Sequence, residues 1–190
     1  MNIETSELQQ LLKVIEEKNL SILEAIDLIK GNSIPDEQVK SEQIKPTEEI
    51  TLIVDYSKTV EKMIAAGKYD WKNSDITNKH FPLLAELSGQ KTAVSKLFHF
   101  NRGISSDDVI SEMDKAGYRP ATLPELLALG EIQPDLQRQF PIIALGSIWR
   151  NADGSRRVSY LSVGGSGRVL HLVWFGYVWD ALCRFLGVRK

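Results

Sequence analysis

The C-terminal segment of this chain places the tightest constraint on its fold, because large apolar residues recur there within a restricted set of residue types. Between Asn151 and Arg189 the chain contains no Glu, Gln, Met or Lys. Those four types make up about one in four of the first 150 residues, which is ordinary for a soluble protein. So abrupt a change indicates a restriction on residue type that folding alone does not impose. The segment is therefore the first place to look for function.

Residues 168–174 show the alternation that is typical of a β-strand with one buried face. One face carries Leu170, Leu172 and Trp174, and the other carries Val169, His171 and Val173. We expect the first set to enter the core and the second to form a partly covered surface. The preceding Gly164–Gly167 predicts a hairpin turn rather than a phosphate-binding loop, because neither a Lys-Ser/Thr pair nor a helix start follows it.

The rest of the domain predicts an α+β fold, with helices in the first half and sheet in the second. Start signals, in which a hydroxyl side chain is followed three residues later by an acid, stand at Ser105 and Thr122. We expect helices over 57–66, 105–117 and 122–130. We expect strands over 50–54, 96–100, 141–149, 157–161, 168–174 and 184–188. The aromatic-rich stretch 68–84 predicts a connection.

The N-terminal part predicts a separate unit. Apolar residues at helical spacing indicate a helical hairpin within 1–32, and the polar stretch 33–49, with two prolines and no aromatic residue, predicts a linker. Residues 50–190 then form the main domain. The sequence leaves open whether the hairpin sets an oligomeric state, recruits a partner or packs on the domain.

Composition narrows the class of protein further. The formal charge is −2, so no strong positive field argues for nucleic acid. We see no apolar run of the ~18 residues that a membrane span needs and no signal peptide, and we expect a cytoplasmic protein. Arginines gather after residue 150, which predicts either stacking and pairing within the domain or a positively charged binding face.

Few residues suggest catalysis or metal binding. The histidines His80, His99 and His171 share no metal-ligand spacing, so we expect no metal and no cofactor. The single cysteine, Cys183, excludes an intrachain disulfide, and no local motif makes it a nucleophile. We therefore expect a protein that is not an enzyme.

The spacing of the large residues carries a family resemblance. The frame consists of Arg157, Val158, Leu161, Arg168, Leu170, Leu172, Trp174, Phe175, Trp179, Cys183, Arg184, Phe185, Leu186, Val188 and Arg189. It resembles the variable region of the target proteins of diversity-generating retroelements, and 117–127 and 140–149 are similar to their framework. The resemblance covers about 50–190, with the variable region at about 157–190. It implies a C-type-lectin-like fold, related to that of formylglycine-generating enzymes.

In that family, reverse transcription misincorporates at template adenines, so that AAC and AAT codons are randomised at their first two bases. Such codons cannot encode Glu, Gln, Lys, Met or Trp, which matches the restricted residue set of the C-terminal segment. The resemblance implies variable, ligand-binding positions at Ser162, Val163, Gly165, Val169, His171, Val173, Gly176, Tyr177, Val178, Asp180, Ala181 and Leu182. It leaves open whether Tyr160 and Cys183 are variable or framework. Ser159 and Gly187 depart from the Pro and Ala expected there.

The resemblance implies a non-catalytic hypervariable protein that presents residues 162–182 to a macromolecular ligand, a protein, with Tyr177 and His171 as anchors. Three alternatives stay open. An enzyme on a related fold would need a redox cysteine pair, and the chain has one cysteine. A calcium-dependent lectin would need more carboxylates than the C-terminal segment holds. Nucleic-acid contact through the arginines is disfavoured because most of them occupy frame positions.

Overall fold

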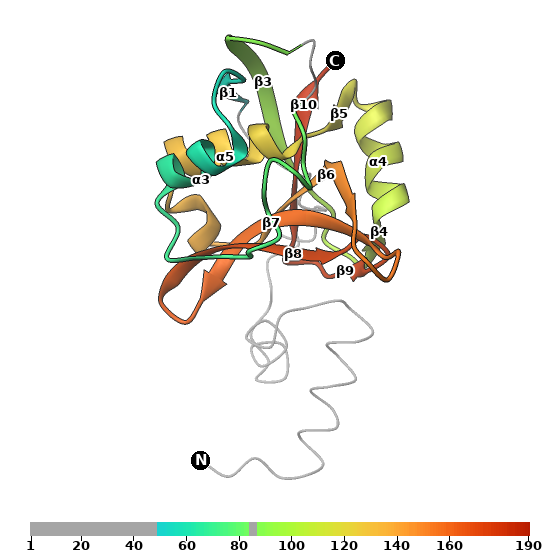
Figure 1. The fold of residues 1–190 in the computed structure, drawn as a ribbon. Coiled ribbons are helices and arrows are strands. Elements are labelled where there is room, and N and C mark those ends of the chain that lie inside the picture. Colours follow the sequence, from blue (N-terminus) through green and yellow to red (C-terminus); the bar gives the residue numbers. More distant parts are fainter. Residues whose placement is uncertain (1–48, 84–86) are drawn as a thin grey trace, which may run out of the picture. The chain divides into compact units, whose positions relative to one another are not determined.

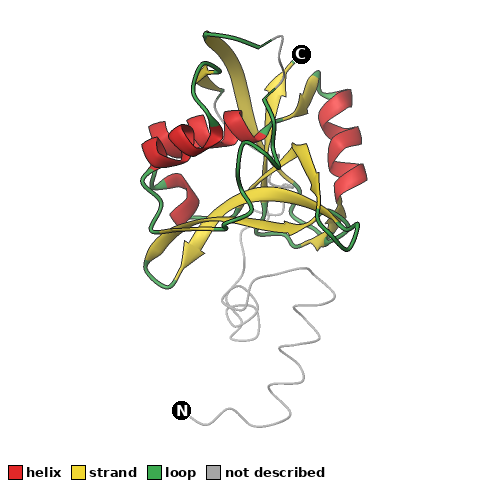
Figure 2. Ribbon diagram, viewed as in Figure 1, coloured by secondary structure: helices red, strands yellow, loops and turns green. Residues whose placement is uncertain are grey.

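A computed structural model describes residues 49–83 and 87–190 of the chain. The described part is a mixed α+β structure, rich in strands, as the sequence predicts (Figure 2). The predicted hairpin within 1–32 and residues 33–48 of the predicted linker lie outside the described residues.

The strands of the described domain form one large mixed sheet and one small one. Their bounds are β1 Ile50–Asp55, β2 Trp71–Lys72, β3 Gln90–His99, β4 Ile104–Ser105, β5 Tyr118–Pro120, β6 Ile142–Arg150, β7 Arg156–Gly164, β8 Gly167–Trp174, β9 Val178–Trp179 and β10 Arg184–Arg189. The large sheet runs in the order β1-β3-β10-β6-β7-β8-β2, with β5 also paired to β10. The C-terminal strand β10 therefore lies inside the sheet, and β4 pairs with β9 separately.

Helices begin where the sequence places hydroxyl caps. Their bounds are α3 Val60–Gly67, α4 Ser106–Lys115, α5 Leu123–Ile132 and the 3₁₀ helix η1 Leu136–Arg138. Ser105 caps α4 by accepting from the Asp108 amide at 3.1 Å. The Glu125 carboxylate accepts from the Thr122 amide at 2.7 Å and so completes the predicted capping box of α5.

Two apolar cores lie on opposite faces of the sheet. The first packs α3 and α5 against β1, β6 and β8, and the second packs α4 against β6, β7 and the segment 175–183. Strand β6 contributes side chains to both cores, because Ile142 and Ala144 enter the first core while Ile143 and Leu145 enter the second. Figure 1 shows α3 and α5 on one side and α4 on the other. This explains why 142–145 is a continuous apolar run instead of alternating.

A buried arginine joins strand β8 to the ends of two helices. The Arg168 guanidinium, 6% exposed, donates to the carbonyl oxygens of Gly67 at 2.7 Å and Gly130 at 2.7 Å. It also donates to Gln137 Oε1 at 3.2 Å. The two glycines stand in the last turns of α3 and α5, where carbonyls lack helical partners and the helix dipole favours a cation.

The ring of Tyr69 packs into the same junction. The Arg168 guanidinium lies 5.0 Å from its centroid, and burial raises the pKa of this phenol well above its ordinary value. A Cβ at Gly67 or Gly130 would lie 2.5 or 2.0 Å from Tyr69 atoms, so neither position has room for a side chain. Gly67 is therefore kept for this close approach, and the left-handed residue after α3 is Lys68, with φ 48°.

Several predicted elements are confirmed with different bounds. The strands over 96–100 and 157–161 are longer, and α3 begins at Val60 instead of 57. The connection 68–84 contains the two-residue strand β2, which the sequence does not signal. Gly164–Gly167 forms the predicted hairpin turn, with Gly165 at φ 63°.

One prediction about the core is wrong. Leu170 and Leu172 are buried as expected, but Trp174 is 52% exposed. Strand β8 extends beyond the first core before Trp174 is reached, and its ring lies over Gly176, where a Cβ would approach it to 2.7 Å. The tryptophan that does fill a core is Trp179, which is 3% exposed.

We predict opposite outcomes for the two tryptophans. Trp179→Ala should reduce the free energy of unfolding by about 3–5 kcal/mol, because it leaves a cavity in the second core. Trp174→Ala should reduce it by less than about 1 kcal/mol, because the side chain is largely in water. Urea-induced unfolding followed by circular dichroism measures both, and equal losses would contradict this assignment.

Candidate functional site

None of the predicted variable residues is buried. The exposed ones are Val163, Gly165, Gly176, Tyr177, Val178, Asp180 and Leu182. The partly exposed ones are Ser162, Val169, His171, Val173 and Ala181. They fall into two groups, one on the β7–β8 hairpin and one on the segment 175–183. Of the two positions that the sequence left open, Cys183 is buried and Tyr160 is half-buried.

Most of the hairpin group lies on the face of β7 and β8 that is turned away from α3 and α5, whereas Val163 stands opposite Arg168 on the other face and Gly165 lies in the turn. Ser162 stands opposite Val169 and Tyr160 opposite His171 in the antiparallel register. Directly opposite residues of such a pair share one face of the sheet, so these four side chains adjoin. The strands are paired along their whole length, from Arg157↔Trp174 to Gly164↔Gly167. The backbone beneath this group is therefore held by main-chain bonds.

Every fourth residue anchors the segment 175–183. Phe175, Trp179 and Cys183 are buried in the second core, and the residues between them face outward. The hydroxyl of Ser106 ties two of these anchors together, because it donates to the Phe175 carbonyl oxygen at 2.5 Å and accepts from Trp179 Nε1 at 2.9 Å. A buried polar pair of this kind fixes one arrangement of the loop on α4.

Further backbone contacts hold the outward-facing residues. Val178 pairs with Ser105 between β9 and β4, and His99 Nε2 lies 2.8 Å from the Ala181 carbonyl oxygen. Asp180 differs from its neighbours, because its carboxylate accepts from the Leu182 amide at 2.8 Å and so closes the turn. Asp180 is thus a predicted variable residue whose side chain helps to hold the local main chain.

The two groups adjoin through residues at the edge of the second core. Tyr160 from β7 and Val173 from β8 both pack against that core, which the segment 175–183 also covers. Figure 1 shows β7, β8 and β9 together on one side of the domain. The predicted variable residues therefore occupy neighbouring parts of one surface.

Trp71 enlarges this surface from outside the C-terminal segment. It is 47% exposed on β2, beside Val169, and its ring centroid lies 4.8 Å from that of His171. The His171 centroid in turn lies 5.8 Å from that of Tyr160. An aromatic row thus crosses β7, β8 and β2. The sequence prediction missed Trp71, because only the pairing of β2 with β8 brings it here.

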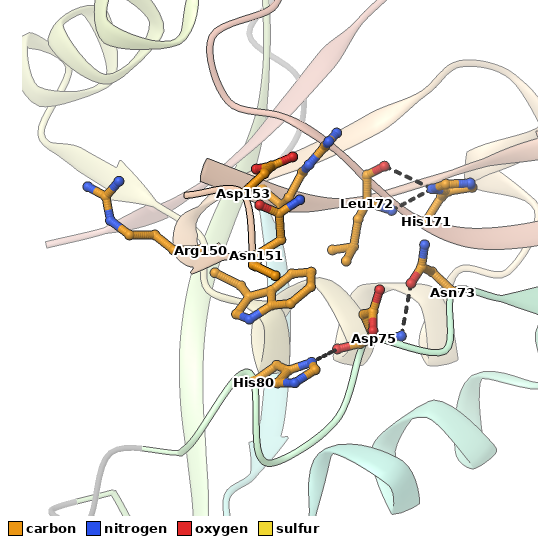
Figure 3. A pocket seen from close by; sticks show the side chains of 11 residues that line it. Asn73, Asp75, His80, Arg150, Asn151, Asp153, His171 and Leu172 are labelled. Atoms are coloured by element: carbon orange, nitrogen blue, oxygen red, sulfur yellow. Dashed lines mark hydrogen bonds between the residues drawn. The ribbon is translucent and has the colours of Figure 1, made fainter. Parts of the chain in front are cut away.

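A groove of about 850 Å³ opens next to His171 (Figure 3). Its walls include His80, Trp149, Arg150 and Arg157, and its floor reaches Leu172 of β8. The rings of His80 and Trp149 are stacked with centroids 4.5 Å apart. The groove is comparable in size to the ~300–1,000 Å³ of ligand pockets.

The titratable groups do not form a catalytic cluster among the described residues. His80 Nδ1 lies 2.9 Å from the Asp75 carbonyl oxygen, whereas His99 contacts the Ala181 carbonyl oxygen elsewhere. Burial raises the pKa of the Cys183 thiol to about 12, so it is protonated at neutral pH. This thiol does not supply the thiolate that a cysteine nucleophile needs.

One tripeptide bears on the calcium-dependent lectin alternative, namely Gln133-Pro134-Asp135, which stands just before η1. Here the Asp135 carboxylate accepts from Arg138 Nε at 3.1 Å at the start of η1. Within 49–83 and 87–190, no three His, Cys, Asp or Glu side chains are grouped so that they could hold a metal ion. None of the helices in these ranges is long and apolar enough to cross a membrane.

Most basic residues of the C-terminal segment have partners inside the domain. Arg156 and Arg184 lie over the rings of Phe175 and Phe140, and Arg168 is buried. Arg189 pairs with Glu49, and Lys190 pairs with Asp114. Stacking and pairing therefore account for these groups, as the first of the two sequence alternatives predicts.

We predict that replacing Tyr177, Val178 and Leu182 together by Ser leaves the fold intact. These side chains are 48%, 66% and 70% exposed, so the thermal midpoint should shift by only a few degrees. Differential scanning calorimetry measures the shift. A matched triple variant of buried Phe175, Trp179 and Phe185 to Ser should fail to fold, and unfolding of the first variant would show that its residues belong to the core.

Comparison with known proteins gave no match to a family model, to a curated protein or to a solved structure.

Proposed function

We propose that this chain is a non-catalytic hypervariable binding protein whose C-terminal segment is diversified by a retroelement. In this proposal the domain 50–190 has a C-type-lectin-like fold, and residues 162–182 bind a macromolecular ligand that is itself a protein. The variable positions are the twelve that the sequence resemblance implies.

One observation carries the proposal, namely that burial separates the implied frame from the implied variable positions. Frame positions that are buried are Val158, Leu161, Arg168, Leu170, Leu172, Phe175, Trp179, Phe185, Leu186 and Val188, and Cys183, which the sequence left open, is buried as well. None of the twelve variable positions is buried. The frame was identified from residue types and spacing alone, so this agreement is independent support. Four frame residues depart from it, because Trp174 and Arg189 are exposed and Arg157 and Arg184 are partly exposed.

The separation provides the physical condition that a diversified surface needs. Side chains at the variable positions can change without opening a cavity, because none of these positions is buried in either core. The backbone beneath them is held by the β7–β8 ladder and by the anchors at every fourth residue of 175–183. Binding residues on a rigid scaffold of this kind vary without loss of the fold.

The surface also has the composition of a protein-binding site. Tyr177, Val178 and Leu182 expose apolar area next to one another in sequence, and the centroids of Tyr177 and buried Trp179 lie 5.6 Å apart in an edge-to-face contact. Such support restricts the Tyr177 ring, and restricted aromatic rings bind at low entropic cost. Together with Trp71 and His171, these residues would form part of a standard interface, which buries about 800 Å² on each partner.

A display library tests whether the positions are free to vary. Randomising the twelve positions with codons that end in C or T should leave most members resistant to protease. The same codons at buried frame positions Leu161, Leu170, Leu172, Trp179 and Phe185 should abolish resistance, because large apolar side chains are lost from the cores. Panning the first library against lysozyme should enrich members with Kd near or below about 1 μM. Equal protease sensitivity of the two libraries would refute the proposal.

The neighbouring DNA tests how the surface arises. We expect a near-identical copy of the stretch that encodes 157–190, with AAC or AAT at the twelve positions, near a gene for a reverse transcriptase. Sequencing of the locus in independent isolates should find substitutions at those codons and none at the buried frame codons. A locus without the copy, or with changes spread evenly over the segment, would contradict retroelement diversification.

A further inference from the structure

Strand β8 has an edge that β2 covers only in part. The two strands pair at Trp71↔Val169 and Lys72↔Leu170, and the Asn73 amide donates to the Leu170 carbonyl oxygen at 2.9 Å. Alternate residues of a strand direct their N–H and C=O groups to the same edge. Leu172 therefore directs both groups, and Trp174 its N–H, to the edge beyond the end of β2, while the Trp174 carbonyl oxygen accepts from the Tyr177 amide at 3.1 Å.

At this edge the main chain of Leu172 meets only its neighbour's ring among the described residues. His171 Nδ1 lies 2.7 Å from the Leu172 amide nitrogen and 2.8 Å from its carbonyl oxygen (Figure 3). A single ring nitrogen cannot serve both groups. Without a proton, Nδ1 accepts from the Leu172 N–H and faces the lone pairs of the carbonyl oxygen. With a proton, Nδ1 donates to the carbonyl oxygen and cannot accept from the N–H. In either state, therefore, the ring satisfies only one of the two main-chain groups of Leu172.

The groove runs along this edge. Leu172 and His171 form one side of its 850 Å³. The remainder is lined by Ala152 and by aromatic, charged and polar residues, namely Asn73, Asp75, His80, Trp149, Arg150, Asn151, Asp153 and Arg157. A chain segment lying against β8 would have one row of side chains in the groove and the other toward the aromatic row of Trp71, His171 and Tyr160, because side chains alternate between the two faces of a sheet.

We propose that an extended peptide segment of the protein ligand pairs with the edge of β8 at Leu172 and Trp174, displaces the His171 ring and fills the groove. The inference deepens the proposed function and rests on it, because it assumes a protein ligand. The chemistry selects a peptide, since N–H and C=O groups alternating along an edge are matched by another main chain.

Strand pairing of this kind separates main-chain contacts, which do not depend on residue type, from side-chain contacts, which do. Main-chain bonds to Leu172 and Trp174 are the same whatever residues occupy the variable positions, so they contribute affinity to every variant. His171 is itself an implied variable position, and its replacement by Ser or Gly removes the ring from the edge. Variation at this one position therefore changes access to the edge as well as the side-chain surface.

A matched pair of variants at Trp174 tests the pairing. Peptides selected from a phage-displayed random dodecapeptide library on the full chain serve as the probe. Trp174→Ala removes the indole and keeps the N–H, whereas Trp174→Pro also removes the N–H, and proline is tolerated at a strand edge. We expect peptides that bind the Ala variant and bind the Pro variant at least about tenfold more weakly, because a main-chain bond is lost. Thermal unfolding shows whether both variants fold.

Hydrogen exchange gives a second readout on the unmodified chain. A bound peptide should slow exchange of the Leu172 amide at least about tenfold, while the Val173 amide, which faces β7, serves as the internal reference. Peptides that bind without slowing Leu172 exchange, equal affinity for the Ala and Pro variants, or a library without binders would each overturn the inference.

The triple Ser variant at Tyr177, Val178 and Leu182 separates this inference from the proposed function. If peptides lose affinity for the triple variant but do not slow exchange of the Leu172 amide in the unmodified chain, strand pairing is refuted and the proposed function is supported. Protection of Leu172 with unchanged affinity in the triple variant supports strand pairing and counts against the proposed function.

Discussion

The contact on which the remainder of this domain depends is the buried guanidinium of Arg168. It satisfies the carbonyl groups of Gly67 and Gly130 in the last turns of α3 and α5, and thereby fixes the start of β8 against both helices. Its backbone amide is bound as well, by the Asp70 carboxylate at 2.6 Å just before β2. Buried charge is tolerated here because each of the three guanidinium nitrogens donates to a carbonyl or amide oxygen and two helix dipoles point at the group.

With β8 fixed on one face, the opposite face is free to carry a surface. The second core holds the segment 175–183 by one residue in four, through Phe175, Trp179 and Cys183. Stability and surface are thus assigned to different residues of the same stretch of chain. That division supports the proposed hypervariable surface and explains how a dozen neighbouring positions could change while the two cores keep their packing.

Sequence patterns predicted much of this arrangement and missed parts of it for identifiable reasons. The hydroxyl caps at Ser105 and Thr122 act locally, so α4 and α5 begin where expected. Trp174 shares the face of Leu170 and Leu172, yet alternation does not say where a core ends along a strand. Trp71 and the groove beside Leu172 depend on pairing between segments about a hundred residues apart, and no local pattern records such pairing.

The sequence by itself determined the α+β class and the hairpin at Gly164–Gly167. These follow from periodicity, capping and residue type, which are properties of neighbouring residues. Only the tertiary structure decided that Trp179 and not Trp174 fills a core, that Arg168 joins two helices to β8, and that β2 pairs with only part of the β8 edge. Each of these depends on which distant segments meet, because burial and pairing are set by the whole fold rather than by local spacing.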